Sequence, residues 1–311
     1  MKTIAYAAGF AASLAAGVAL AQQYPSFSFS GYGTLGAVHS DEDRADYLVD
    51  AFKPNGPGYS DQVSYKVDTR LGGQATAAFS PRFSGVVQVL VQQNHDNSWR
   101  PRVEWANLKY QVTDDVSIRA GRVVLPVFMV TDTRRVGYAN VWVRPPVEMY
   151  SLVPVTNNDG ADATWRLPVG MWTNTLQFTV GRSDSKFPNA SGFDAGKAEA
   201  RRIVAFVDTV EAGPFTARLS VGEARLTIAA YRQLFDAFRM FGPPGEAIAE
   251  RYGVDDRRAT FLGLSASYDP GTWFATGEWA RFDTRSVVGR RSAWYLSAGP
   301  RIGKLTPYAT Y

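Results

Sequence analysis

The sequence contains no cysteine and only two histidines, His39 and His95, among its 311 residues. A disulfide framework and thiolate-ligated zinc or iron–sulfur sites are therefore excluded, and little room is left for a metal centre built from histidine. Apolar residues make up 45% of the chain and the mean hydropathy is −0.19, which does not fit several membrane-crossing helices of about 20 apolar residues. The basic residues are scattered and the net charge is only +4, so no nucleic-acid partner is expected.

The first 21 residues have the features of an export signal. One basic residue, Lys2, precedes an uncharged apolar run over 4–20, and Ala19-Leu20-Ala21 supplies the small side chains that signal peptidase accepts. An uncleaved membrane anchor is the alternative, but a polar, alternating segment follows, without a basic flank. We expect a signal peptide over residues 1–21 and a mature chain, residues 22–311, that works outside the cytoplasm.

A long alternation of apolar and polar residues begins at position 63. Between Val63 and Ser80, one set of alternate positions is apolar and includes Val67, Leu71 and Ala75. The other set is polar and includes Lys66, Asp68 and Arg70. Because side chains of a strand alternate between its two faces, this pattern predicts one apolar and one polar face. The run is long enough for a tilted strand that crosses a bilayer, which takes about 9–11 residues.

Similar segments predict thirteen strands, near 26–39, 63–80, 83–93, 101–112, 116–125, 159–167, 172–182, 200–210, 215–224, 259–268, 273–283, 291–301 and 305–311. Tight turns such as Pro168-Val169-Gly170 and Asp269-Pro270-Gly271 alternate with longer segments without exception. Short turns at one rim and long loops at the other are typical of a bacterial outer-membrane barrel. The sequence thus predicts an all-β fold, an antiparallel transmembrane β-barrel with short periplasmic turns and long outer loops.

Two further segments bear on this interpretation. Thirteen strands would leave the last strand running outward, whereas bacterial single-chain barrels have even strand numbers. Either one strand is miscounted or the natural chain continues past Tyr311, and we expect the second.

Residues 226–241 place apolar side chains at helical spacing before Gly242-Pro243-Pro244-Gly245, which predicts an amphipathic helix in an outer loop.

Several motifs resemble those of Gram-negative outer-membrane porins. They are Phe27-Ser28-Phe29-Ser30-Gly31-Tyr32-Gly33, Thr69-Arg70-Leu71-Gly72-Gly73, Gly121-Arg122-Val123-Val124-Leu125-Pro126 and Val136-Gly137-Tyr138-Ala139-Asn140. The second departs from the family pattern at its Thr and its last Gly. The resemblance implies 16 strands, of which about 13 are present here, a homotrimer, and an outer membrane of lipid and lipopolysaccharide around the barrel.

The resemblance also implies that the third outer loop, 126–158, folds into the lumen. Its charged residues would then form the pore constriction: Asp132, Arg134, Arg135, Arg144 and Glu148. Charged residues on polar strand faces would line the lumen wall: Lys66, Asp68, Arg70, Lys109, Arg119 and Arg218. The excess of arginine predicts a mild preference for anions. Alternatively, these arginines are solvated loop charges or bind lipopolysaccharide phosphates.

We therefore expect a porin for passive diffusion of small hydrophilic solutes or ions, without cofactor, metal or enzymatic activity. No serine or aspartate stands in a recognisable active-site motif, and the two histidines fall near loops. A non-conducting structural or adhesive barrel that binds a partner through its outer loops is the alternative. A secreted soluble β-sandwich is the third hypothesis.

Overall fold

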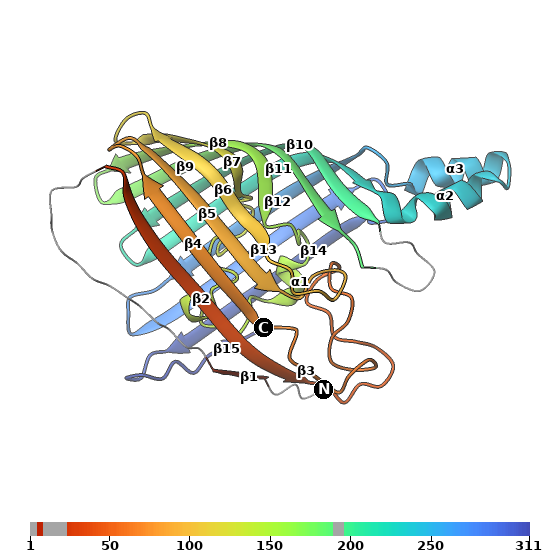
Figure 1. The fold of residues 1–311 in the computed structure, drawn as a ribbon, viewed down its shortest axis with the longest axis horizontal. Helices are drawn as coiled ribbons and strands as arrows, with labels where there is room; N and C mark the ends of the chain where they lie inside the picture. Colours follow the sequence, from red (N-terminus) through yellow and green to blue (C-terminus); the bar gives the residue numbers. More distant parts are fainter. Residues whose placement is uncertain (1–4, 9–23, 189–195) are drawn as a thin grey trace.

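Long tilted strands form one antiparallel sheet that curves round on itself (Figure 1). The computed structural model describes residues 5–8, 24–188 and 196–311. The strands are β1 (Ala5–Ala8), β2 (Ser26–His39), β3 (Val63–Ser64), β4 (Arg70–Ala78), β5 (Phe83–Gln92), β6 (Arg102–Gln111), β7 (Val116–Val124), β8 (Asn157–Val169), β9 (Trp172–Lys186), β10 (Lys197–Ala212), β11 (Phe215–Ile228), β12 (Arg257–Tyr268), β13 (Trp273–Thr284), β14 (Arg290–Pro300) and β15 (Ala309–Thr310). The helices are η1 (Gly137–Ala139), α1 (Val147–Tyr150), η2 (Ala229–Tyr231), α2 (Arg232–Arg239) and α3 (Pro243–Tyr252).

The strands pair in chain order, from β1 and β2 through β4 to β15, and β3 pairs with the end of β2. Among the described residues, no pairing joins β15 to β1 or β2, so the sheet is open along that seam. The predicted signal peptide, 1–21, lies outside the described residues except for β1, which pairs with residues 35–38 of β2. The predicted all-β antiparallel architecture is confirmed.

The alternation of short and long connections is confirmed from β2 to β13 but not beyond, because the β13–β14 connection, 285–289, is shorter than the β14–β15 connection, 301–308. Short turns such as 170–171 and 213–214 join strands at one end of the sheet, and segments such as 40–62 and 229–256 join them at the other. Gly170 and Gly213 have φ of 62° and 56°, a left-handed conformation that glycine adopts without steric cost. These two turns therefore depend on glycine.

The two faces of the sheet differ as the alternation predicts. On β11, Leu219 is 37% exposed on the convex face, whereas Ser220 points to the concave side and is 3% exposed. Leu71 of β4 is 62% exposed on the convex face. An apolar exterior around a more polar interior is the pattern of a barrel whose outer surface meets lipid.

The predicted strand over 63–80 is wrong in its first part. Residues 65–69, between β3 and β4, do not pair with β2 as a strand. Instead, the Thr69 hydroxyl accepts a hydrogen bond from the N–H of Gly36 at 3.1 Å and donates one to its C=O at 3.4 Å. Val67 is consequently buried instead of facing outward. The predicted last strand, 305–311, is reduced to β15.

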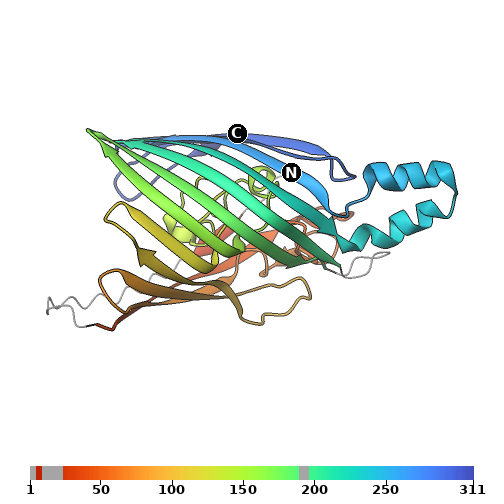
Figure 2. The ribbon, with the colours of Figure 1, turned by 90° about the horizontal axis from the view of Figure 1, so that it is seen from above.

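The predicted helix over 226–241 is partly wrong as well. Residues 226–228 complete β11, and α2 begins only at Arg232. A second helix, α3, starts at Pro243, because proline is tolerated in the first turn of a helix, where its missing N–H would have no partner. The α2–α3 hairpin projects beyond the end of the sheet that carries the long loops (Figures 1 and 2). In the described part of the chain, no helix is both long and apolar enough to span a membrane.

An arginine on the convex face should destabilise the protein in lipid. Leu264 is exposed in the middle of β12, so Leu264→Arg should lower the free energy of unfolding from vesicles by about 2–4 kcal/mol. Val169 is exposed beside a tight turn, and Val169→Arg should cost about 0–1 kcal/mol. Urea titration measures both values; equal costs would contradict a lipid-facing band.

Candidate functional site

The segment between β7 and β8, residues 125–156, lies on the concave side of the sheet and is called the inner loop here (Figure 2). Its apolar side chains pack against inward-facing residues of distant strands. Phe128 meets Phe261 of β12 in an edge-on ring contact with centroids 5.5 Å apart. The buried cluster that results contains Leu125, Val127, Phe128, Trp142, Met149, Tyr150, Leu152, Ile203, Phe261, Ala280 and Tyr295.

The carboxylate of Glu278 on β13 fastens the inner loop to the wall. Glu278 is 3% exposed, and it accepts hydrogen bonds from the backbone N–H of Met129 (2.8 Å) and the hydroxyl of Tyr150 (2.5 Å). Two wall residues, Tyr295 and Ser265, donate to the same carboxylate at 2.8 and 2.9 Å. A buried carboxylate needs such donors to offset its lost hydration, and the two bonds from Met129 and Tyr150 fix the position of the loop.

Neighbouring strands hold the loop at two more points. Trp142 donates its indole N–H to Ser297 of β14 at 2.9 Å and to Thr310 of β15 at 3.2 Å. Arg218 of β11 donates to the carbonyl of Phe128 at 2.7 Å. The inner loop is thus fastened from β11 to β15.

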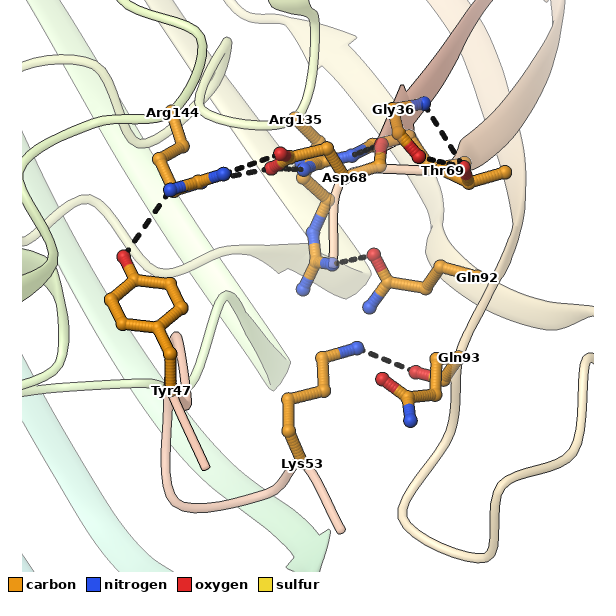
Figure 3. Close-up of polar contacts among 10 residues, drawn as sticks. Gly36, Tyr47, Lys53, Asp68, Thr69, Gln92, Gln93, Arg135 and Arg144 are labelled. Carbon is orange, nitrogen blue, oxygen red and sulfur yellow. Dashed lines mark hydrogen bonds and ion pairs between the residues drawn. The ribbon is translucent and has the colours of Figure 1, made fainter. Parts of the chain in front are cut away.

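On the opposite side, an ion pair connects the loop to the segment 65–69 that precedes β4 (Figure 3). Arg144 forms a bidentate pair with Asp68, with nitrogen–oxygen distances of 3.0 and 2.5 Å, and its guanidinium also donates to the Tyr47 hydroxyl at 3.3 Å. Asp68 also lies 3.5 Å from the guanidinium of Arg70. Because Asp68 is buried, both pairs are shielded from solvent.

A second set of contacts surrounds Arg135. Its guanidinium donates to Gln92 of β5 at 2.8 Å and to Thr156 at 3.1 Å, and it lies 3.3 Å from the buried carboxylate of Glu104 on β6. Thr156 donates a short hydrogen bond to the same carboxylate. The inner loop therefore extends across the interior from β11–β15 to β5 and β6.

These contacts leave a narrow cavity of about 60 Å³ that is rich in positive charge. Its charged lining residues are Asp50, Lys53, Asp68, Arg70, Arg134, Arg135 and Arg144. Arg134 lies over the ring of Tyr150, with its guanidinium carbon 5.4 Å from the ring centroid. One terminal nitrogen of Arg134 is buried and has no hydrogen-bond partner among the described residues. Such a group would gain from contact with an anion.

The structure places the predicted constriction residues in two groups. Arg134, Arg135 and Arg144 all line the narrow cavity, whereas Asp132 and Glu148 are exposed and do not line it.

The predicted wall residues are also divided. Asp68 and Arg70 line the narrow cavity, and Lys66 lies outside the ladder in segment 65–69. Lys109 is half-buried on β6, away from the cavity. Arg119 forms a bidentate pair with Asp162 of β8, at 2.6 to 3.1 Å. Arg218, as described above, contacts the backbone of the inner loop.

Sequence reasoning missed three residues of the site. Glu278 is the one charged residue between positions 273 and 280 of a predicted strand, and this signal could have marked it as inward-facing. Glu104 shares its predicted strand with Arg102 and Lys109, so the signal there is weaker. Lys53 lies in a long loop and carries no such signal. It is buried and donates to the carbonyl of Gln93 at 2.5 Å (Figure 3). The pKa of Lys53 is lowered from 10.5 to about 7, chiefly by burial; Asp50 opposes this shift, and the nearby arginines Arg135, Arg102 and Arg70 contribute to it.

No protein-family model and no curated protein sequence matches the chain. OmpF of Salmonella typhi, solved as a complex with daunomycin, is similar to 92% of this chain and is covered over 78% of its own length. The TM-score is 0.50 and the identity 14%. The chain has the fold of outer-membrane porins. Two further solved structures match 92% of this chain: OccAB1 of Acinetobacter baumannii (10% identity, 81% of that chain, TM-score 0.43) and an anion-selective porin from Comamonas acidovorans (9%, 88%, 0.35).

Removing the charge of Glu278 should release the inner loop. Glu278→Gln turns one acceptor oxygen into a donor that faces other donors, so the free energy of unfolding in micelles should fall by about 2–3 kcal/mol. Trypsin should then cleave faster after Arg134 and Arg135. Glu250→Gln, on the exposed face of α3, is the control and should change neither quantity. Unchanged cleavage and stability of Glu278→Gln would show that this carboxylate does not fix the loop.

The lowered pKa of Lys53 predicts a pH-dependent contribution to stability. Between about pH 7 and pH 10.5, the unfolded chain binds a proton at Lys53 that the folded chain does not, so folding becomes more favourable as pH rises. The difference in unfolding free energy between wild type and Lys53→Met should therefore rise with pH, by at most about 1.4 kcal/mol per pH unit. Lys304→Met, at an exposed position, should show no such slope. A flat difference for Lys53→Met would refute the shift.

Proposed function

We propose that this protein, after loss of its signal peptide, is an outer-membrane porin that passes small hydrophilic solutes and ions passively, with a mild preference for anions. The observation that carries the proposal is the inner loop, fastened across the interior of a porin fold with its arginines around a narrow cavity. A loop at this place limits the width of the passage, so it acts as a sieve. Transport of this kind involves no reaction and no cofactor.

The preference for anions follows from charge counting in the narrow cavity. Asp68 lies between Arg144 and Arg70, and Glu104 is paired with Arg135. Arg134 has no such carboxylate partner among the described residues, so the cavity keeps a positive surplus. In a confined, partly desolvated space, fixed charge acts more strongly on a passing ion than it does in water.

The surroundings are part of the proposal. The convex face would contact outer-membrane lipid and lipopolysaccharide, and the family resemblance suggests a homotrimer. The resemblance of the motifs and the exposed apolar side chains on the convex face support this placement.

Arg134 is the sharpest position at which to test the preference for anions. Arg134→Gln should reduce the chloride-to-potassium permeability ratio by about twofold or more, which corresponds to only about 0.4 kcal/mol. Reversal potentials in a potassium chloride gradient across a planar bilayer measure this ratio. Arg239→Gln removes an arginine from the projecting helix α2 and should leave the ratio unchanged. If both variants behave like wild type, Arg134 does not set selectivity.

One observation favours the second candidate, a non-conducting barrel that binds a partner. The α2–α3 hairpin projects from the sheet, and two large apolar side chains at its bend, Met240 and Phe241, are 82% and 76% exposed. Absence of channel steps from the pure, refolded protein would favour this candidate over the porin.

A further inference from the structure

An apolar cavity of about 320 Å³ lies beside the inner loop, at the end of the sheet with the long loops. On one side it is lined by the end of the inner loop, from Ser151 to Val155. On the other side it is lined by the concave faces of β10, β11 and β12. The volume falls within the range of small-molecule sites, about 300–1,000 Å³.

The wall of this apolar cavity departs from the usual polar lining of a porin. Four successive inward positions of β11 are Gly222, Ala224, Leu226 and Ile228, and all four line the cavity. Small inward residues of β10, such as Ala200 and Ala205, continue it. Small side chains here leave space that the inner loop does not fill, so the apolar wall is not explained by packing of the loop alone.

A second cavity, of about 360 Å³, adjoins the first, and we call it the outer cationic cavity. Phe52, Pro154 and Val155 line both cavities, so the two share a rim. The outer cationic cavity has six lysines and arginines against three aspartates: Lys53, Arg100, Arg102, Arg122, Arg135 and Lys186 against Asp50, Asp96 and Asp184. A negative group on a bound molecule would therefore be attracted to this side.

Two polar side chains that line these cavities, Arg102 and Ser183, can form further hydrogen bonds. Arg102 has one long ion pair, 3.9 Å to Glu104. The hydroxyl of Ser183, which lines the apolar cavity, is buried and has no hydrogen-bond partner among the described residues. Both groups could bind a ligand without breaking a short contact of the protein.

We propose that the mouth of this barrel contains a binding site for amphipathic monocarboxylates, with the hydrocarbon body in the apolar cavity and the carboxylate in the outer cationic cavity. This inference rests on the proposed function, because it names a class of solute for the same passage. A neutral alcohol would leave the cationic side unused, and an alkylammonium ion would be repelled by it. The occupant is a free solute; an acyl chain of membrane lipid is the competing occupant.

Equilibrium dialysis of radiolabelled octanoate tests the proposal, with the full-length protein in lipid nanodiscs. Ala224→Phe fills the apolar cavity and should weaken octanoate binding more than about tenfold. Ala217→Phe makes the same change at an outward position near the other end of β11 and should bind as wild type does. Arg102→Gln should weaken binding about tenfold, because a charge-assisted hydrogen bond is lost. Unlabelled acetate and octanol should compete at least about tenfold less well than octanoate.

Several outcomes would overturn the proposal. Equal octanoate binding by wild type and Ala224→Phe would exclude the apolar cavity as the site, and octanol competing as well as octanoate would exclude the cationic side. Lipid that copurifies with wild type but not with Ala224→Phe, together with no octanoate binding, would show that lipid occupies the cavity. If Ala224→Phe does not fold, Gly222→Val replaces it, since a Cβ at Gly222 meets its nearest neighbour at an ordinary 3.5 Å.

Conductance separates this inference from the proposed function. Anion-preferring conductance without octanoate binding would refute the proposed binding site and support the proposed porin function. Octanoate binding by a protein that shows no channel steps would refute the proposed porin function and support the proposed binding site.

Discussion

The buried carboxylate of Glu278 is the constraint on which the interior of this barrel depends. A charge inside a protein is tolerated only where donors replace its water, and here the inner loop supplies two of the four. Loop and wall therefore need each other: without the loop, Glu278 would lose half of its donors, and without Glu278, Tyr150 would lose its acceptor. The apolar cluster around Phe128 also stabilises the packed loop. It does not fix the exact position of the loop along the wall, because apolar contacts are not directional.

The inner loop divides the interior into regions of different character. Towards β10–β13 lies the apolar cavity, and towards β4–β6 lie the two cationic ones. The outer cationic cavity shares Phe52 with the apolar cavity, and it shares Lys53 and Arg135 with the narrow cavity. An apolar surface and a cationic one thus lie side by side at Phe52, and the cationic one continues to the narrow cavity through Lys53 and Arg135.

Much of the fold could be predicted from the sequence, because alternation with period two and glycine-rich turns act locally. The break at 65–69 could not, since it depends on the hydroxyl of Thr69 meeting Gly36, more than thirty positions away. The site was predicted less completely. The arginines of the inner loop were predicted because the family resemblance pointed to their segment, and their partner Asp68 was predicted from its polar strand face. Glu104 was missed, because it lies on a distant strand and nothing local links it to Arg135. The stretch from Ile203 to Val207 is apolar at every position, so it does not show the alternation expected of a barrel strand. In the structure, its inward side chains Ile203 and Ala205 line the apolar cavity, and Ile203 also belongs to the buried cluster of the inner loop.

The guanidinium groups of Arg135 and Arg144 hold the inner loop and also charge the narrow cavity, so a change at either residue alters the anchorage of the loop and the charge of the cavity together. Loss of Arg144 would leave Arg70 as the ion-pair partner of Asp68, and it would remove one contact that holds the loop and one positive charge of the cavity in a single step. Arg134 is different, because it rests on an aromatic ring and holds no carboxylate among the described residues. A substitution at Arg134 would therefore lower the positive charge of the narrow cavity without removing an ion pair that holds the inner loop.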